Sequence, residues 1–129
     1  MKRFLAILLV FICSMVLTAN ALAATNFSYS GSQTTTMMSW SSPATSSGTR
    51  WHLTWDTVNS NVSSTKRAVI RIYAGPGDYA SSLYVYNSFS TAYHSYNSGY
   101  GEGKKETYIG GRLDDRDSGT LKAYGIFYN

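Results

Sequence analysis

The stretch Thr49–Val58, TRWHLTWDTV in one-letter code, carries the strongest structural signal in the chain. Large apolar side chains occupy every second position, at Trp51, Leu53 and Trp55, and mostly polar side chains lie between them. Successive side chains of a β-strand point to opposite faces of the sheet. The period of two therefore predicts a strand with one buried face.

The same alternation continues on both sides of the turn signal Gly-Pro-Gly-Asp at residues 75–78. Residues 67–74 and 82–89 each alternate apolar and polar or aromatic side chains, and Gly and Pro favour a tight turn between them. We therefore expect a β-hairpin in which Leu83 and Val85 face the interior of the protein.

Further strands are expected around residues 27–29, at 107–113 and at 120–128, with a bulge at the Gly-Gly pair 110–111. About six or seven strands result, separated by turns rich in Gly, Asp, Asn and Ser. This pattern predicts an all-β fold, a small antiparallel β-sandwich or barrel.

The N-terminus has the three parts of a secretory signal peptide. Lys2 and Arg3 form a positive start, residues 4–17 are apolar except for one serine, and Ala21-Leu22-Ala23 is a small-residue cleavage motif. The alternative is an uncleaved membrane anchor, but an apolar core of about 14 residues is short of the ~20 that a spanning helix needs. We therefore predict that residues 1–23 are a signal peptide and that the product is secreted.

Residues 24–129 are then one domain by length. The single cysteine, Cys13, lies in the signal segment, so the mature domain contains none. Without Lys2 and Arg3 the domain has nine Lys and Arg against seven Asp and Glu, too weak an excess to indicate nucleic-acid binding. No second long apolar segment follows residue 24, so we expect no stable membrane insertion, and the oligomeric state stays open.

No catalytic motif is recognisable. A Ser-His-acid triad needs a histidine beside a carboxylate, but His52 and Asp56 on one strand are roughly 13 Å apart. The other histidine, His94, lies in a segment rich in Tyr, Ser and Gly, between residues 90 and 105. The acids suited to glycoside hydrolysis lie in predicted turns, where they are solvated. We therefore expect a protein that is not an enzyme.

Metal ligands are also few. Asp114, Asp115 and Asp117, with Gly119, offer oxygen atoms at the close spacing that calcium sites use. The full EF-hand loop pattern is absent, so we interpret this segment as a hairpin turn and leave calcium binding as the alternative. With two histidines and no cysteine in the mature domain, zinc is disfavoured, and we expect no metal or cofactor.

Tyrosine is the most unusual component, since all eleven tyrosines and all three tryptophans follow the signal segment. Tyrosine offers a flat apolar face and a hydrogen-bonding tip, which suits contact with sugars or proteins. The alternative is that tyrosines simply cover one sheet face. The residues expected to form a binding surface are Tyr84, Tyr86, Tyr93, Tyr96, Tyr100 and Tyr124.

These observations favour a secreted, non-enzymatic domain that binds a cell-envelope glycan or an extracellular protein. In composition and layout, the chain also resembles the lactococcin-972-type bacteriocins: small, exported, cysteine-free when mature, rich in Tyr, Ser, Asn and Gly, and ending in an aromatic strand, here residues 120–128. That resemblance implies the alternative function, a small secreted antibacterial protein.

Overall fold

The computed structural model describes residues 23–129, which contain ten β-strands and no helix. Apart from Ala23, the predicted signal peptide, residues 1–23, lies outside the described residues. The strands are β1 (Ala24–Gly31), β2 (Met38–Ser39), β3 (Ala44–Thr45), β4 (Arg50–Trp55), β5 (Ala68–Gly75), β6 (Asp78–Tyr79), β7 (Tyr84–Tyr86), β8 (His94–Ser95), β9 (Glu106–Leu113) and β10 (Leu121–Tyr128).

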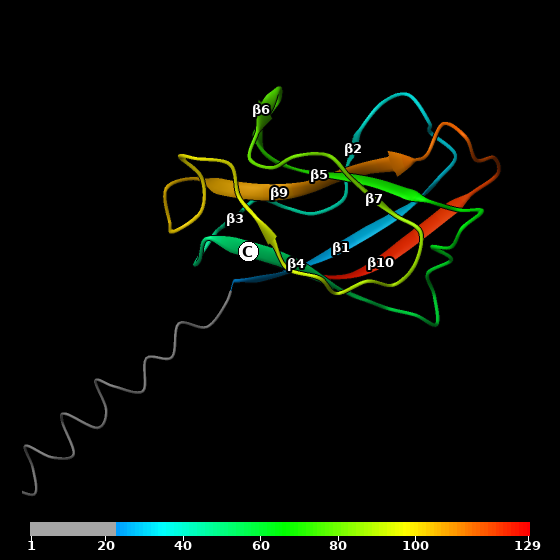
Figure 1. Cartoon of the computed structure of the whole chain (residues 1–129), viewed down its shortest axis with the longest axis horizontal. Coiled ribbons are helices and arrows are strands. Elements are labelled where there is room, and N and C mark those ends of the chain that lie inside the picture. The colour runs from blue at the N-terminus through cyan, green and yellow to red at the C-terminus, as the bar shows by residue number, and fades with distance from the viewer. Residues whose placement is uncertain (1–22) are drawn as a thin grey trace, which may run out of the picture.

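Two antiparallel sheets pack face to face, as the two layers of Figure 1 show. The smaller sheet has the order β1-β10-β4-β8, and the larger has the order β2-β9-β5-β6, with β3 also pairing β9 and β7 also pairing β5. The all-β sandwich prediction is therefore confirmed. Six strands have three or more residues, in line with the expected number, and the other four are two-residue pairings.

The predicted interior of β4 is confirmed, because Trp51 and Leu53 are fully buried and Trp55 is nearly so. They pack against the inward residues of β5, among them Ile70 and Ile72, which are also fully buried. Within residues 23–129, the two sheets enclose one hydrophobic core.

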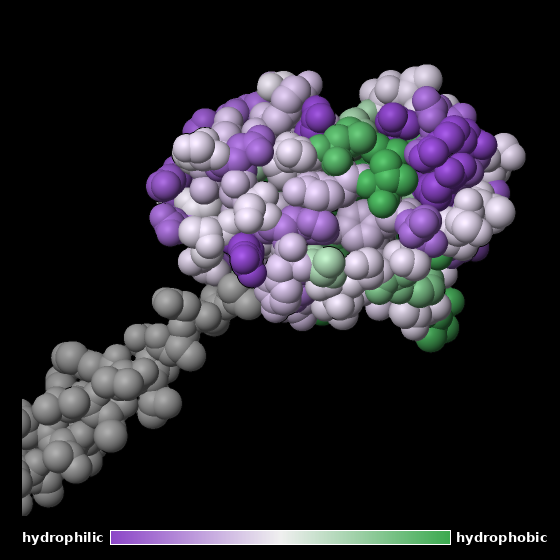
Figure 2. Space-filling view, viewed as in Figure 1, coloured by the Kyte–Doolittle hydropathy of each residue, from purple (hydrophilic) through white to green (hydrophobic). Residues whose placement is uncertain are grey.

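The hairpin of β5 and β7 is confirmed, but the predicted orientation of β7 is wrong. In the observed register Ile70 pairs with Tyr84, and Val69 pairs with Val85. Paired residues lie on the same face of a sheet, so the inward Ile70 places Tyr84 inside and leaves Val85 outside. Val85 is 47% exposed and Tyr86 only 5%. Figure 2 shows the resulting apolar patch over β7.

The predicted bulge at residues 110–111 is also wrong, because β9 pairs with β5 without a break through both glycines. Aromatic rings occupy the space where side chains would lie. A Cβ on Gly110 would be 2.6 Å from the Tyr73 ring, and one on Gly111 would be 2.4 Å from the Trp40 ring. The glycines thus mark close contacts with aromatic rings.

The two sides of the sandwich are closed differently. On one side, the backbone of Trp40 bridges the sheets, because it accepts a hydrogen bond from Ser28 N (2.8 Å) and donates one to Ile109 O (2.9 Å). On the other side, β7 pairs only with β5, and β8 only with β4, among the described strands. The candidate site lies between β7 and β8.

Candidate functional site

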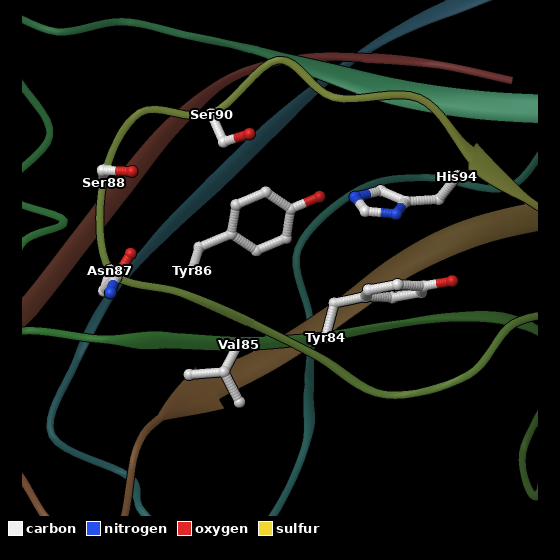
Figure 3. A pocket seen from close by; sticks show the side chains of 7 residues that line it. All are labelled: Tyr84, Val85, Tyr86, Asn87, Ser88, Ser90 and His94. Atoms are coloured by element: carbon white, nitrogen blue, oxygen red, sulfur yellow. The ribbon is translucent and has the colours of Figure 1, made fainter.

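A pocket of about 300 Å³ lies between β7 of the larger sheet and β8 of the smaller one. Figure 3 shows its lining side chains, which come from β7, from the segment that follows it, and from the start of β8. The lining residues are Tyr84, Val85, Tyr86, Asn87, Ser88, Ser90 and His94. Two of the six predicted binding residues, Tyr84 and Tyr86, therefore share this pocket.

Aromatic rings form the inner part of the pocket. His94 pairs with Trp51 across β4 and β8, and their ring centroids are 4.8 Å apart. The Tyr84 ring lies 4.0 Å from the His94 ring, and the Tyr86 ring meets it edge-on at 6.0 Å. Since Trp51 is fully buried, the pocket stands directly on the hydrophobic core, which holds its aromatic rings in place.

Burial determines the charge state of the pocket. Desolvation lowers the pKa of His94 from its ordinary value, so the neutral imidazole is favoured near pH 7. Desolvation also raises the pKa of Tyr86, which keeps its phenol protonated. The Tyr86 hydroxyl is buried, makes no hydrogen bond to the described residues, and is directed toward the His94 ring in Figure 3.

The rim of the pocket is polar and uncharged, with the exposed Asn87 and Ser88 and the half-buried Ser90. Two contacts position the rim. The carbonyl oxygen of Ser90 accepts a hydrogen bond from Trp55 Nε1 (2.9 Å), and the hydroxyl of Ser90 accepts one from Ala92 N (3.3 Å). The chain after β7 is therefore fastened to the core beside the pocket.

The other four predicted tyrosines do not join this pocket. Tyr93 is 59% exposed and packs on His52, with ring centroids 4.2 Å apart. Tyr124 lines a separate polar pocket with Asp56 and Asn59, on the outer side of the smaller sheet. The predicted single tyrosine surface is therefore divided among several places.

Tyr96 and Tyr100 are partly buried against the core and act mainly in packing. Burial raises the pKa of Tyr96 to about 12. The Tyr100 hydroxyl donates a hydrogen bond to the Asp78 carboxylate, which also accepts one from Lys105 Nζ (2.9 Å). These contacts order much of the segment 90–105, which the sequence indicates only as a long loop.

The predicted Asp-rich turn is present, and two of its carboxylates are bound by arginines. Asp117 pairs with Arg67 at 2.7 Å, and Asp114 pairs with Arg116 at 2.7 Å. Within residues 23–129, no group of three or more His, Cys, Asp or Glu side chains is arranged to hold a metal ion.

Neither histidine contacts a carboxylate through a hydrogen bond in the described part of the chain. His52 stacks on the Tyr128 ring, with centroids 4.6 Å apart and planes 4° apart. The Asp56 carboxylate accepts hydrogen bonds from the Asn59 side chain and from the backbone of Val58 and Asn59. His52 and Asp56 thus have different partners, in agreement with the expectation that they do not touch.

Sequence reasoning missed five members of the pocket: Val85, Asn87, Ser88, Ser90 and His94. The strand register of the β5–β7 hairpin is the feature that could have indicated them. Once Ile70 is placed inside, its partner Tyr84 is also inside, and the polar residues after β7 then reach the edge of the core.

Between residues 23 and 129, no helix is long and apolar enough to cross a bilayer. Comparison with protein-family models, with curated proteins and with solved structures finds no significant match to this chain.

Proposed function

We propose that this protein is a secreted, non-enzymatic β-sandwich that binds a cell-envelope glycan in the pocket between β7 and β8. The supporting observation is the combination of aromatic rings inside the pocket with an uncharged amide and hydroxyl rim. Export rests on the signal-peptide pattern of residues 1–23.

The chemistry of the lining fits a neutral, polyhydroxylated ligand. The apolar face of a sugar ring packs on aromatic faces such as Tyr84 and His94, while Asn87 and Ser90 offer donors and acceptors to its hydroxyls. Ligand pockets begin at about 300 Å³, so this one suits a single small unit of a longer chain.

The buried Tyr86 hydroxyl adds a second argument for a ligand here. An unpaired polar group in the interior reduces stability, and such groups in native proteins call for an explanation. An oxygen atom of a bound sugar that reaches beneath the rim would give this donor a partner.

The residues that line the pocket are also the reason why the proposal includes no catalysis. His94 is its only side chain that titrates near neutral pH, and no carboxylate lines the pocket to orient that imidazole. Hydrolysis of a glycosidic bond by the usual route requires two carboxyl groups beside the ligand.

The test is retention of the chain from Ala24 on insoluble cell-envelope polysaccharide and peptidoglycan. Wild type is expected to be retained. Tyr84→Ala is expected to weaken retention by about tenfold, because stacking on the sugar is lost. The milder surface change Asn87→Ala is expected to weaken it a few-fold, because one hydrogen bond is lost. Tyr124→Ala is the matched control, because Tyr124 is also half-buried but lines a different pocket.

Equal retention of wild type and both pocket variants would remove this pocket as the binding site. A growth-inhibition assay on related bacteria separates the proposal from the antibacterial alternative, because a glycan-binding domain of this kind is expected to leave growth unchanged.

A further inference from the structure

The outer face of the larger sheet shares only Val85 with the pocket and has an unusual composition. Val69 and Tyr73 of β5 are buried, yet they do not belong to the core cluster, because they point away from the smaller sheet. Their register partners on this face are Val85, Arg112, Tyr79 and Tyr108. We call this surface the arginine face and define it by Arg71, Arg112, Tyr79, Leu83, Val85 and Tyr108.

Two arginines on this face lack a carboxylate partner among the described residues. The Arg71 guanidinium lies 4.2 Å above the Tyr79 ring, and its buried Nε makes no hydrogen bond within residues 23–129. Arg112 Nη1 donates only to the backbone oxygens of Thr34 (2.6 Å) and Leu113 (3.0 Å). Where β5 pairs with β9, the outward positions carry Arg71 and Arg112 and no acidic residue, and the next acidic residue on this face is Glu106 at the start of β9.

Exposed aliphatic side chains lie beside these arginines. Leu83 directly precedes the edge strand β7 and is 42% exposed, and Val85 lies within that strand and is 47% exposed. Figure 2 shows an apolar patch in the region of this strand. By contrast, the outward residues of β1 on the other sheet are Asn26, Ser28 and Ser30. The arginine face therefore differs from the exposed edge strand β1, whose outward side chains are all small and polar.

From this juxtaposition we propose that the arginine face docks onto an anionic lipid surface, as a second binding function beyond the glycan pocket. Arginine binds lipid phosphates, tyrosine favours the headgroup region, and aliphatic side chains gain free energy at the acyl boundary. Contact is peripheral, since only side chains of the sheet face enter the interface.

Two other occupants fit less well. A soluble anionic polymer would satisfy the arginines but would leave Leu83 and Val85 in water. A second copy of the chain, related by a two-fold axis, would bring together four arginines without facing carboxylates, and like charges across an interface are unfavourable.

The experiment is co-sedimentation of the chain from Ala24 with vesicles. Wild type is expected to bind phosphatidylglycerol vesicles and to leave phosphatidylcholine vesicles unbound, with binding weakened by salt. Arg71→Gln is expected to lower the partition coefficient about fivefold, the value typical of one basic residue at an anionic surface. Leu83→Ser is expected to reduce it by a similar factor, because an apolar anchor is lost.

Matched controls are available on other surfaces. Lys122→Gln removes an exposed charge from the smaller sheet, and Val58→Ser removes a valine that is 89% exposed in the turn after β4. Both variants are expected to bind vesicles as wild type does. Neither Arg71 nor Leu83 lines the glycan pocket, so glycan retention measured on their variants reports separately on the proposed function.

Three results would overturn the docking proposal. The first is absent or equal binding to the two kinds of vesicle. The second is unchanged binding by Leu83→Ser, with soluble polyphosphate displacing the protein, which would identify a polymer site. The third is a concentration-dependent dimer that Leu83→Ser abolishes while vesicle binding is absent, which would identify a contact between copies.

Discussion

Glycine at position 125 illustrates how closely the interior is packed. A Cβ at this position in β10 would lie 2.1 Å from the backbone oxygen of Thr54 and 2.9 Å from the Phe27 ring. The obstructing oxygen belongs to the neighbouring strand β4, which pairs with β10 at this point. Backbone cannot move aside as the end of a flexible side chain can, so any larger residue strains the smaller sheet.

Gly125→Ala is therefore expected to lower the free energy of unfolding by about 1–3 kcal/mol, the range typical of overpacked interiors. Urea unfolding followed by tryptophan fluorescence measures the change. Gly48→Ala is the matched control, because its Cβ would meet nothing nearer than 4.0 Å. If the two variants unfold at the same urea concentration, the close contact at Gly125 is not real.

The two histidines make stability depend on pH. Desolvation lowers the pKa of both His52 and His94 below the ordinary 6.5. In the range below about pH 6.5 the unfolded chain then binds more protons than the folded one, so acid favours unfolding. Above this pH the two histidines are expected to leave the free energy of unfolding unchanged. Below it, the free energy of unfolding is expected to fall as the pH approaches the lowered pKa values of the histidines in the folded protein.

Unfolding curves between about pH 5 and pH 8 measure this effect. The double variant His52→Gln/His94→Gln is expected to have a flatter profile than wild type over that range. A wild-type free energy of unfolding that stays level from about pH 8 down to pH 5, or that rises toward acid, would contradict the expected loss of stability.

At the scale of elements, the turn between β9 and β10 is a polar clamp on the start of β5. The Asp117 carboxylate accepts hydrogen bonds from Arg67 N (2.6 Å), Nε (3.1 Å) and Nη2 (2.7 Å). The pKa of Asp117 is lowered chiefly by these side-chain hydrogen bonds from Arg67. Asp114 is held in the same way, because Arg116 donates to it through Nε (2.7 Å) and Nη2 (2.8 Å).

This clamp predicts the outcome of a calcium titration. Arginine already occupies the carboxylate oxygens that calcium needs, so added Ca²⁺ or a chelator is expected to leave the Tm unchanged. Asp117→Asn is expected to lower the Tm, since the charged acceptor for Arg67 is lost. A rise in Tm on addition of Ca²⁺ that Asp117→Asn abolishes would instead establish a calcium site.

The strands differ in how well their own residues specify orientation. In β4 the tryptophan and leucine side chains fall on one face, and the predicted interior is confirmed. In β7 both faces carry apolar surface, valine on one and tyrosine on the other, so periodicity leaves the choice of face undecided. The register with β5 makes that choice, and it places Tyr84 and Tyr86 at the pocket.

At the scale of the whole molecule, the two proposed surfaces lie on opposite faces of the same hairpin. Tyr84 and Tyr86 turn inward to the pocket, while Leu83 and Val85 turn outward to the arginine face. The alternation of a strand thus separates a site with a neutral lining from a cationic, apolar surface. The two proposals together predict that the domain contacts envelope glycan and lipid at once.

The sequence by itself determined the all-β class, the β5–β7 hairpin and the inward face of β4, because alternation and turn residues act over a few neighbouring positions. Only the tertiary structure decided the pocket and the arginine face. His94 meets Tyr84 because two sheets converge there, and Arg71 lies over Tyr79 because a hairpin folds back. Such contacts depend on register and layer packing, which no local pattern of residues specifies.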